Sequence, residues 1–262
     1  MARKKPSTPE PAPRKGARRM ADVSPALLRK LESGQIEAMS LAEILKIDTR
    51  ALCRSVLPSV PARAWEAIDP ALGITQRLLT GARIAVEHLG PKAAFDALTD
   101  HTSDTARGLA CYALGVREWP LDKKLRAIVP LADDRNSGVR EWAWIALRPA
   151  VATELERAIE LLEPWTRERS ANLRRYASEI TRPRGVWCAH LTALRADPAP
   201  GLRILEPLRA DTTKYVQDSV ANWLNDAGKD APAFVRSVTA RWAKESPGEA
   251  TARIIRRAMR NL

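Results

Sequence analysis

The chain has 262 residues, 45% of them hydrophobic, which suffices for one large domain or two small domains with a proper core. No apolar stretch approaches the roughly 18 to 20 residues that span a bilayer, and the N-terminal segment lacks a secretory signal, so we expect a cytoplasmic protein. The net charge of +12 indicates a polyanionic partner.

Cysteine and histidine form no metal-binding or redox pattern in this sequence. The three cysteines lack CxxC spacing and the histidines are equally scattered: Cys53, Cys111, Cys188, His88, His101 and His190. We therefore expect no disulfide framework, no metal ion and no cofactor.

Residues 1–20 are Pro-rich, charged and free of aromatic side chains, which predicts a disordered basic N-terminal arm. They carry a net charge of +6, and residues 21–262 carry the other +6, so the folded body is basic in its own right. Arg supplies 32 of the 43 basic residues, and its planar guanidinium fits phosphate in a bidentate manner. A GC-rich genome would produce the same bias without any function.

Helical patterns follow the arm. In "SPALLRKLESG", Ser24 is a predicted N-cap, Pro25 takes the first helical position and Gly34 follows the helix end. The next segments, "SLAEILKID", "TRALCRSVL", "ITQRLLTGARIAVEHLG" and "PKAAFDALTD", have apolar residues every three to four positions. No stretch shows sustained alternation, so we predict helices and no strands.

A repeat begins near residue 100, where a polar lead-in, an apolar anchor and an amphipathic helix recur. The anchors are spaced by 33, 34, 43 and 34 residues and are Ala106, Val139, Leu173, Val216 and Ala250. A second helix fits between successive anchors, for example "DKKLRAIVPLA" and "GLRILEPLRA". The pattern predicts an all-α fold, a right-handed superhelical α-solenoid of HEAT-like helix pairs, with residues 21–262 as one domain and the best-matched repeats in 100–262. The concave surface of such a stack is its expected binding face.

Two segments carry a family resemblance. "RRYASEITRPRGVW" (174–187) and "YVQDSVANWLNDAGKD" (215–230) resemble the paired signatures of the HEAT-like-repeat alkylpurine DNA glycosylases, in particular the AlkC branch of the AlkC/AlkD superfamily. The resemblance covers residues 130–245 best. It implies that the protein hydrolyses the N-glycosidic bond of cationic N3- or N7-alkylated purines in double-stranded DNA. We expect a monomer that is associated with the nucleoid.

The resemblance places Asp226 at the family's essential aspartate and Glu179 at a second active-site acid. One or two ionised carboxylates near C1′ suit this chemistry, because they stabilise an oxocarbenium-like sugar. Asp226 falls in the last turn of its predicted helix, where the macrodipole disfavours a carboxylate, with Asn222 one turn earlier and Lys229 one turn later. The alternative is that Asp226 forms only an Asx-type turn before Gly228.

The same motifs supply candidate DNA contacts. Trp187 matches the aromatic residue beside the lesion, where a ring can make cation–π contact with a charged base; the alternative is a tryptophan that only packs helices. Arg182 and Arg184 flank Pro183 in a rigid turn suited to phosphate contact or, alternatively, only exposed to solvent. Arg148, Asn222 and Lys229 complete the expected DNA-binding set.

The sequence departs from the family at one place. "REWAWIALRPAV" keeps Arg148 before a proline but has Trp144 where the family has an acid, with Glu141 one turn earlier. Either Glu141, or Glu179 together with Asp226, suffices for catalysis without this acid, or the activity is altered or lost. Trp144 lies about 100° around the helix from the predicted core residue Ala143, which favours a stacking wedge on the surface.

Two other functions compete with base excision. A catalytically silent relative would bind damaged or distorted DNA without releasing a base. A protein-binding HEAT scaffold would have no use for the excess positive charge or the two motifs. Salt-dependent DNA binding separates the scaffold from the other two, and release of a free alkylated base separates the enzyme from the silent relative.

Overall fold

The computed structural model describes residues 14–262, and within that range it contains helices and no β-strand. No helix of this range is both long and apolar enough to cross a bilayer. The α-helices are α1 Pro25–Glu32, α2 Leu41–Lys46, α3 Thr49–Val56, α4 Ile74–Leu89, α5 Pro91–Thr99, α6 Asp104–Gly115, α7 Leu121–Ala132, α8 Ser137–Thr153, α9 Leu155–Leu162, α10 Ala171–Ile180, α11 Thr192–Ala196, α12 Leu202–Leu205, α13 Lys214–Gly228, α14 Pro232–Glu245 and α15 Glu249–Ala258.

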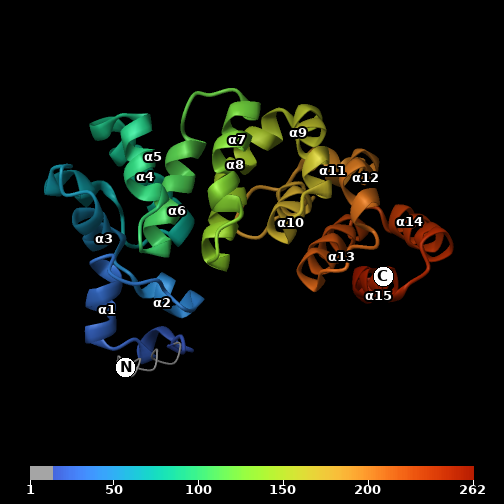
Figure 1. Cartoon of the computed structure of the whole chain (residues 1–262), viewed down its shortest axis with the longest axis horizontal. Helices are drawn as coiled ribbons and strands as arrows, with labels where there is room; N and C mark the ends of the chain where they lie inside the picture. Colours follow the sequence, from blue (N-terminus) through green and yellow to red (C-terminus); the bar gives the residue numbers. More distant parts are fainter. Residues whose placement is uncertain (1–13) are drawn as a thin grey trace, which may run out of the picture.

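The helices stack in two layers that form an arch (Figure 1). Helices α6, α8, α10, α13 and α15 line the inner side and pack successively on one another, whereas α5, α7, α9, α12 and α14 lie outside them. The N-terminal helices α1 and α2 stand at one end of the arch and the C-terminus at the other. This arrangement confirms the predicted all-α solenoid of helix pairs.

Polar lead-in residues start several of these helices. The hydroxyl of Ser24 accepts a hydrogen bond from the amide of Leu27, and Ser103 caps α6 in the same way. The side chains of Asn136 and Ser170 cap α8 and α10. Since each cap satisfies an amide that the first turn leaves free, these short residues fix where the inner helices begin.

One continuous hydrophobic core runs through the described chain, from Val23 to Ala258. Four of the five predicted anchors are buried, and Ala250 is half-buried. The inner helices therefore bury their apolar residues mainly against neighbouring repeats, which gives the arch its cohesion.

The predicted helix over residues 201–210 is shorter than expected. Only Leu202–Leu205 is α-helical, and the turn Glu206–Leu208 continues as a 3-10 helix. Pro207 has no amide hydrogen to donate to the preceding turn, which disfavours a regular α-helix at this point. The outer layer is consequently irregular beside α10 and α13.

Part of the predicted N-terminal arm is folded. Residues 1–13 lie outside the described range, but the segment after them contacts α2 and its N-cap Ser40. Arg14 donates to both carboxylate oxygens of Glu43, and the amide of Ala17 donates to the same side chain. Glu43 is fully buried, and because a buried carboxylate needs such partners, residues 14–20 belong to the folded body.

Candidate active site between α10 and α13

Two buried carboxylates meet at the ends of neighbouring inner helices. Glu179 lies in the last turn of α10 and Asp226 in the last turn of α13, and both are at most 5% exposed. Arg182 joins them: its Nη1 donates to Oε1 of Glu179 at 2.6 Å, and its Nε and Nη2 donate to Oδ2 of Asp226 at 2.9 and 2.6 Å. The structure thus brings together the two acids that the motifs single out.

Glu179 has no free carboxylate oxygen. The hydroxyl of Ser219 donates to its Oε2 at 2.6 Å, and Arg175 lies 3.4 Å from the same oxygen. Ser219 in turn accepts a hydrogen bond from Ser178 at 2.7 Å. Glu179 therefore holds the guanidinium groups of Arg175 and Arg182 in place.

Asp226 has one oxygen with fewer hydrogen-bond partners than the other. Its Oδ2 accepts both bonds from Arg182, whereas Oδ1 contacts only Nζ of Lys229, at 3.3 Å. Lys229 is about half exposed, and its flexible chain can move away at little energetic expense. The Oδ1 atom is accordingly the carboxylate oxygen best placed to face a cationic substrate.

Opposite charges hold Glu179 ionised. Burial by itself would raise its pKa, but the positive charges of Arg175 and Arg182 and the hydrogen bond from Ser219 bring the pKa below its usual 4.5. Burial likewise acts to lower the pKa of Arg182, and the two carboxylates outweigh it and raise that pKa. Carboxylate and guanidinium are both charged at neutral pH.

Trp187 projects from the loop that follows α10. It is 50% exposed and is the one non-glycine residue of the described chain with a positive φ, 61°. Its ring stacks on that of Trp142, with centroids 6.1 Å apart and planes at 20°. A side chain in the left-handed region is strained by about 1 to 3 kcal/mol, and such strain concentrates at functional sites.

The structure contradicts the expected DNA contact by Arg148. Its side chain is almost fully buried and donates to the carbonyls of Ala189, Ile180 and Arg182, at 3.3 and 2.8 Å for the first two. Arg148 therefore fastens the loop that carries Trp187 and does not reach a phosphate.

The prediction of a surface wedge at Trp144 is also wrong. Its side chain is 2% exposed, and its indole nitrogen donates to Oε2 of Glu141 at 2.8 Å. The helical-phase argument failed because α8 packs against α6, α7 and α10 at once, which buries nearly its whole circumference. Trp144 is a core residue that positions Glu141.

The other expected DNA contacts differ in availability. Arg182 is committed to the two carboxylates, so it is not free for phosphate. Arg184 pairs with Asp230, and the side-chain oxygen of Asn222 accepts from Arg260 at 3.1 Å. Lys229 is the most exposed of these candidates and contacts Asp226.

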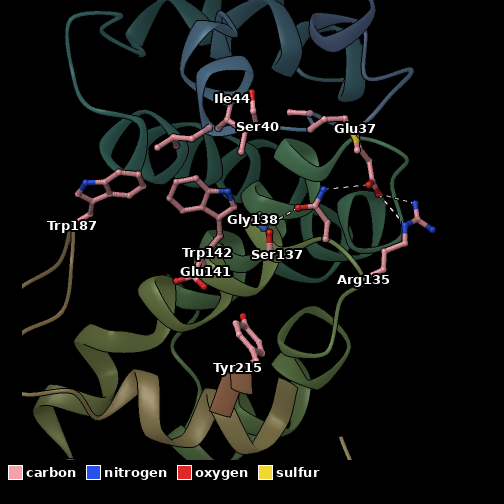
Figure 2. A pocket seen from close by; sticks show the side chains of 14 residues that line it. Glu37, Ser40, Ile44, Arg135, Ser137, Gly138, Glu141, Trp142, Trp187 and Tyr215 are labelled. Atoms are coloured by element: carbon pink, nitrogen blue, oxygen red, sulfur yellow. Dashed lines mark hydrogen bonds and ion pairs between the residues drawn. The ribbon is translucent and has the colours of Figure 1, made fainter. Parts of the chain in front are cut away.

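A pocket of about 530 Å³ lies between α2, the start of α8, Trp187 and Tyr215 (Figure 2). Glu141 lines it and forms an ion pair of 2.6 Å with Arg175. Since Arg175 also contacts Glu179, the pocket is connected to the carboxylate pair through one side chain.

Several site residues escaped prediction. Arg175 precedes Glu179 by four positions in the first motif, a spacing that favours an ion pair on a helix, and Ser219 lies inside the second motif. Both could have been found from the sequence. The sequence contains no comparable signal for Trp142 and Tyr215, because their positions beside the site depend on loops and helices that are distant in sequence.

Comparisons with known proteins agree with this fold. A family model described as HEAT repeats matches residues 91–181. The uncharacterized protein YhaZ of Bacillus subtilis (strain 168) is 41% identical over 117 residues, 45% of this chain and 32% of YhaZ. The match thus spans about a third of the length of that relative.

Two solved structures have a fold similar to that of this chain. The Pseudomonas fluorescens alkylpurine DNA glycosylase AlkC, bound to DNA containing an abasic site analog, has a TM-score of 0.64 and 24% identity, covering 89% of this chain and 64% of AlkC. AlkD2 from Streptococcus mutans has a TM-score of 0.61 and 18% identity, covering 79% of this chain and 99% of AlkD2. This chain therefore shares the HEAT-like-repeat fold of AlkC and AlkD2.

Proposed function

We propose that the protein is a DNA glycosylase that removes cationic N3- or N7-alkylated purines from double-stranded DNA. The observation that carries this proposal is the pair of buried carboxylates, Glu179 and Asp226, joined by Arg182. The fold shared with the glycosylase AlkC, which was solved bound to DNA, and the basic charge of residues 21–262 support DNA as the partner.

The chemistry needs little from the protein, since an alkylpurine with a positive charge is already a good leaving group. The bond between C1′ and the purine nitrogen breaks, its electron pair neutralises the base, and a water oxygen forms the new bond to C1′. The water proton passes to a carboxylate or to solvent. A fixed negative charge close to C1′ stabilises the oxocarbenium-like state between these events.

The two carboxylates take different roles in this proposal. Glu179, with both oxygens bonded, holds Arg182 in place. Asp226 offers Oδ1 to the sugar once Lys229 turns toward a phosphate. Arg182 bonds to both acids and helps to hold the pKa of the buried Glu179 below its usual value, so it is a positioning residue and makes no contact with the substrate.

Release of free alkylated base from methylated duplex DNA tests the function directly. Purified protein should release 3-methyladenine or 7-methylguanine and leave abasic sites, without any added metal or cofactor. Salt-sensitive DNA binding without base release would identify a catalytically silent relative instead. Absence of both would favour a protein-binding scaffold.

A further inference from the structure

We propose that the protein grips the phosphates of its duplex at the two ends of the arch, with the folded basic segment 14–20 at one end and the arginines of α15 at the other. This inference deepens the proposed function and rests on it, because it takes DNA as the partner. It names the cations that bind the backbone on either side of the carboxylate pair.

The centre of the inner side supplies no net charge for binding DNA. Six side chains there alternate in sign and form a chain of ion pairs from α8 to α13, namely Glu141, Arg175, Glu179, Arg182, Asp226 and Lys229. Three carboxylates thus balance three cations. Since affinity for a duplex depends on cations that neutralise phosphates, it has to come from other parts of the surface.

A buried carboxylate fixes the basic segment at the first end. Arg14 donates to both oxygens of Glu43, which is fully buried, and the hydroxyl of Ser40 donates to the carbonyl of Ala17 at 2.7 Å. The other three cations of the segment are exposed, and they are Lys15, Arg18 and Arg19. Because the backbone beneath them is already folded, less conformational entropy is lost when these side chains bind a phosphate.

The same segment is tied to the inner helices. Arg14 also donates to the carbonyl of Glu37 at 2.9 Å. The carboxylate of Glu37 accepts from Arg107 of α6 at 2.8 Å and from Arg135, which precedes α8, at 2.7 Å. The three exposed cations therefore stand on a part of the chain whose position relative to the inner layer is fixed by hydrogen bonds.

A row of arginines on α15 forms the second end. Arg253 and Arg257 both contact Oδ1 of Asp218 in α13, at 2.7 and 2.9 Å. Arg260 donates to the side-chain oxygen of Asn222, at 3.1 Å. Three guanidinium groups thus share one carboxylate, which leaves an excess of positive charge along this side of α13.

The two basic ends lie on either side of the candidate active site. In Figure 1 the N-terminal segment (dark blue) and α15 (red) stand at opposite ends of the arch, on its open side. The arginine row runs beside the carboxylate pair, since Asn222 precedes Asp226 by one turn of α13. Phosphate contacts at both ends fix the position of the duplex, and the sugar between them is left to face Asp226.

The salt dependence of binding counts the phosphate contacts at each end, because each contact adds ~0.9 to the slope of log K against log salt concentration. One variant is Lys15→Gln/Arg18→Gln/Arg19→Gln, and the other is Arg253→Gln/Arg257→Gln/Arg260→Gln. Between about 50 and 200 mM salt, we expect either variant to lose about 10- to 40-fold less affinity for an abasic-site duplex than the wild type, as for two or three missing contacts.

A matched control separates the position of the charges from their number. Arg157→Gln/Arg236→Gln/Lys244→Gln removes three exposed cations from the outer helices α9 and α14, and it should keep the wild-type salt dependence. Melting curves check that each variant is folded. If the α15 variant is unfolded, Arg260→Gln replaces it, with an expected difference of about 3-fold over the same salt range.

Hydroxyl-radical footprinting of the same duplex locates the contacts. The wild-type protein should protect the backbone on both sides of the abasic site, and each end variant should lose the protection on one side. Protection that is unchanged in both end variants would overturn the inference. A salt dependence that falls equally in the control and the end variants would also overturn it.

The outcomes for this inference and for the proposed function are distinct. Base release by the wild-type protein, with wild-type salt dependence in both end variants, would reject the two basic ends and leave the glycosylase standing. The expected loss of salt dependence at both ends, without base release by the wild type, would support the two basic ends and contradict the glycosylase.

Discussion

Arg182 donates through both Nε and Nη2 to a single oxygen of Asp226, Oδ2, at 2.9 and 2.6 Å. The other oxygen, Oδ1, is left with only the half-exposed Lys229. This asymmetry explains how an aspartate in the last turn of a helix can be held against the macrodipole. The guanidinium compensates the charge on one side, and the opposite side remains available.

We expect Asp226→Asn to lower the rate of base release about 10² to 10³-fold, because the amide keeps the shape but offers no negative charge. Affinity for abasic-site duplex and thermal stability should change little. The matched control is Asp230→Asn, which removes a carboxylate four residues later that pairs with Arg184 and Arg195. A similar rate in both variants would end the catalytic assignment of Asp226.

Arg182→Met should be strongly destabilising, by about 3 to 5 kcal/mol, because it leaves two buried carboxylates without their shared cation. Arg184→Met removes a more exposed ion pair with Asp230 and should change the free energy of unfolding by less than about 1 kcal/mol. Urea denaturation at pH 7 measures both. Equal small effects would mean that Arg182 does not compensate the carboxylate pair.

Truncation of the two tryptophans of this region should have opposite consequences. Trp144→Ala opens a cavity in the core beside α8 and should reduce the free energy of unfolding by about 3 to 5 kcal/mol. Trp187→Ala should spare stability but weaken binding to abasic-site duplex by about 1 to 3 kcal/mol, the scale of one aromatic–base stack. Thermal melting beside DNA titration checks both, and a stable Trp144→Ala would contradict its core position.

Asp104 should make stability fall as the pH rises. Burial raises its pKa to about 6 from 3.8, although its Oδ1 accepts from the amide of Ala38 at 3.0 Å. Because the folded-state pKa lies above the unfolded one, folding favours the protonated acid. Between pH 3.8 and about 6 the group therefore removes up to about 1.4 kcal/mol of stability per pH unit.

The difference in unfolding free energy between wild type and Asp104→Asn, followed from pH 4 to 8, isolates this contribution. It should shift in favour of the variant as the pH rises toward 6 and then level off. The matched control is Asp100→Asn, which removes an exposed carboxylate four residues earlier. A flat difference for Asp104→Asn would show that its folded and unfolded pKa values are alike.

Removal of residues 1–13 should preserve folding and salt-dependent DNA binding, because the body keeps its own excess of basic residues. Removal of residues 1–20 deletes Arg14 and leaves the buried carboxylate of Glu43 without its cation. We expect only the longer truncation to lower the melting temperature. Melting curves and DNA titrations at two salt concentrations compare the two proteins.

The sequence by itself determined the helices and their order. Caps such as Ser24 and Asn136 and the apolar spacing of each repeat are local signals, since they depend on residues within one or two turns. The two motifs also identified Glu179 and Asp226, which the stacking of α10 on α13 brings within reach of one arginine.

Only the tertiary structure decided which side chains remain free. Arg182 and Arg148 are indistinguishable from phosphate-binding arginines in the sequence, yet one joins two carboxylates and the other fastens the Trp187 loop. Trp144 is buried because α8 is covered on several sides, whereas helical phase defines only one face. These outcomes depend on contacts between residues 32 to 44 positions apart, which form only when the repeats stack, and no local pattern encodes them.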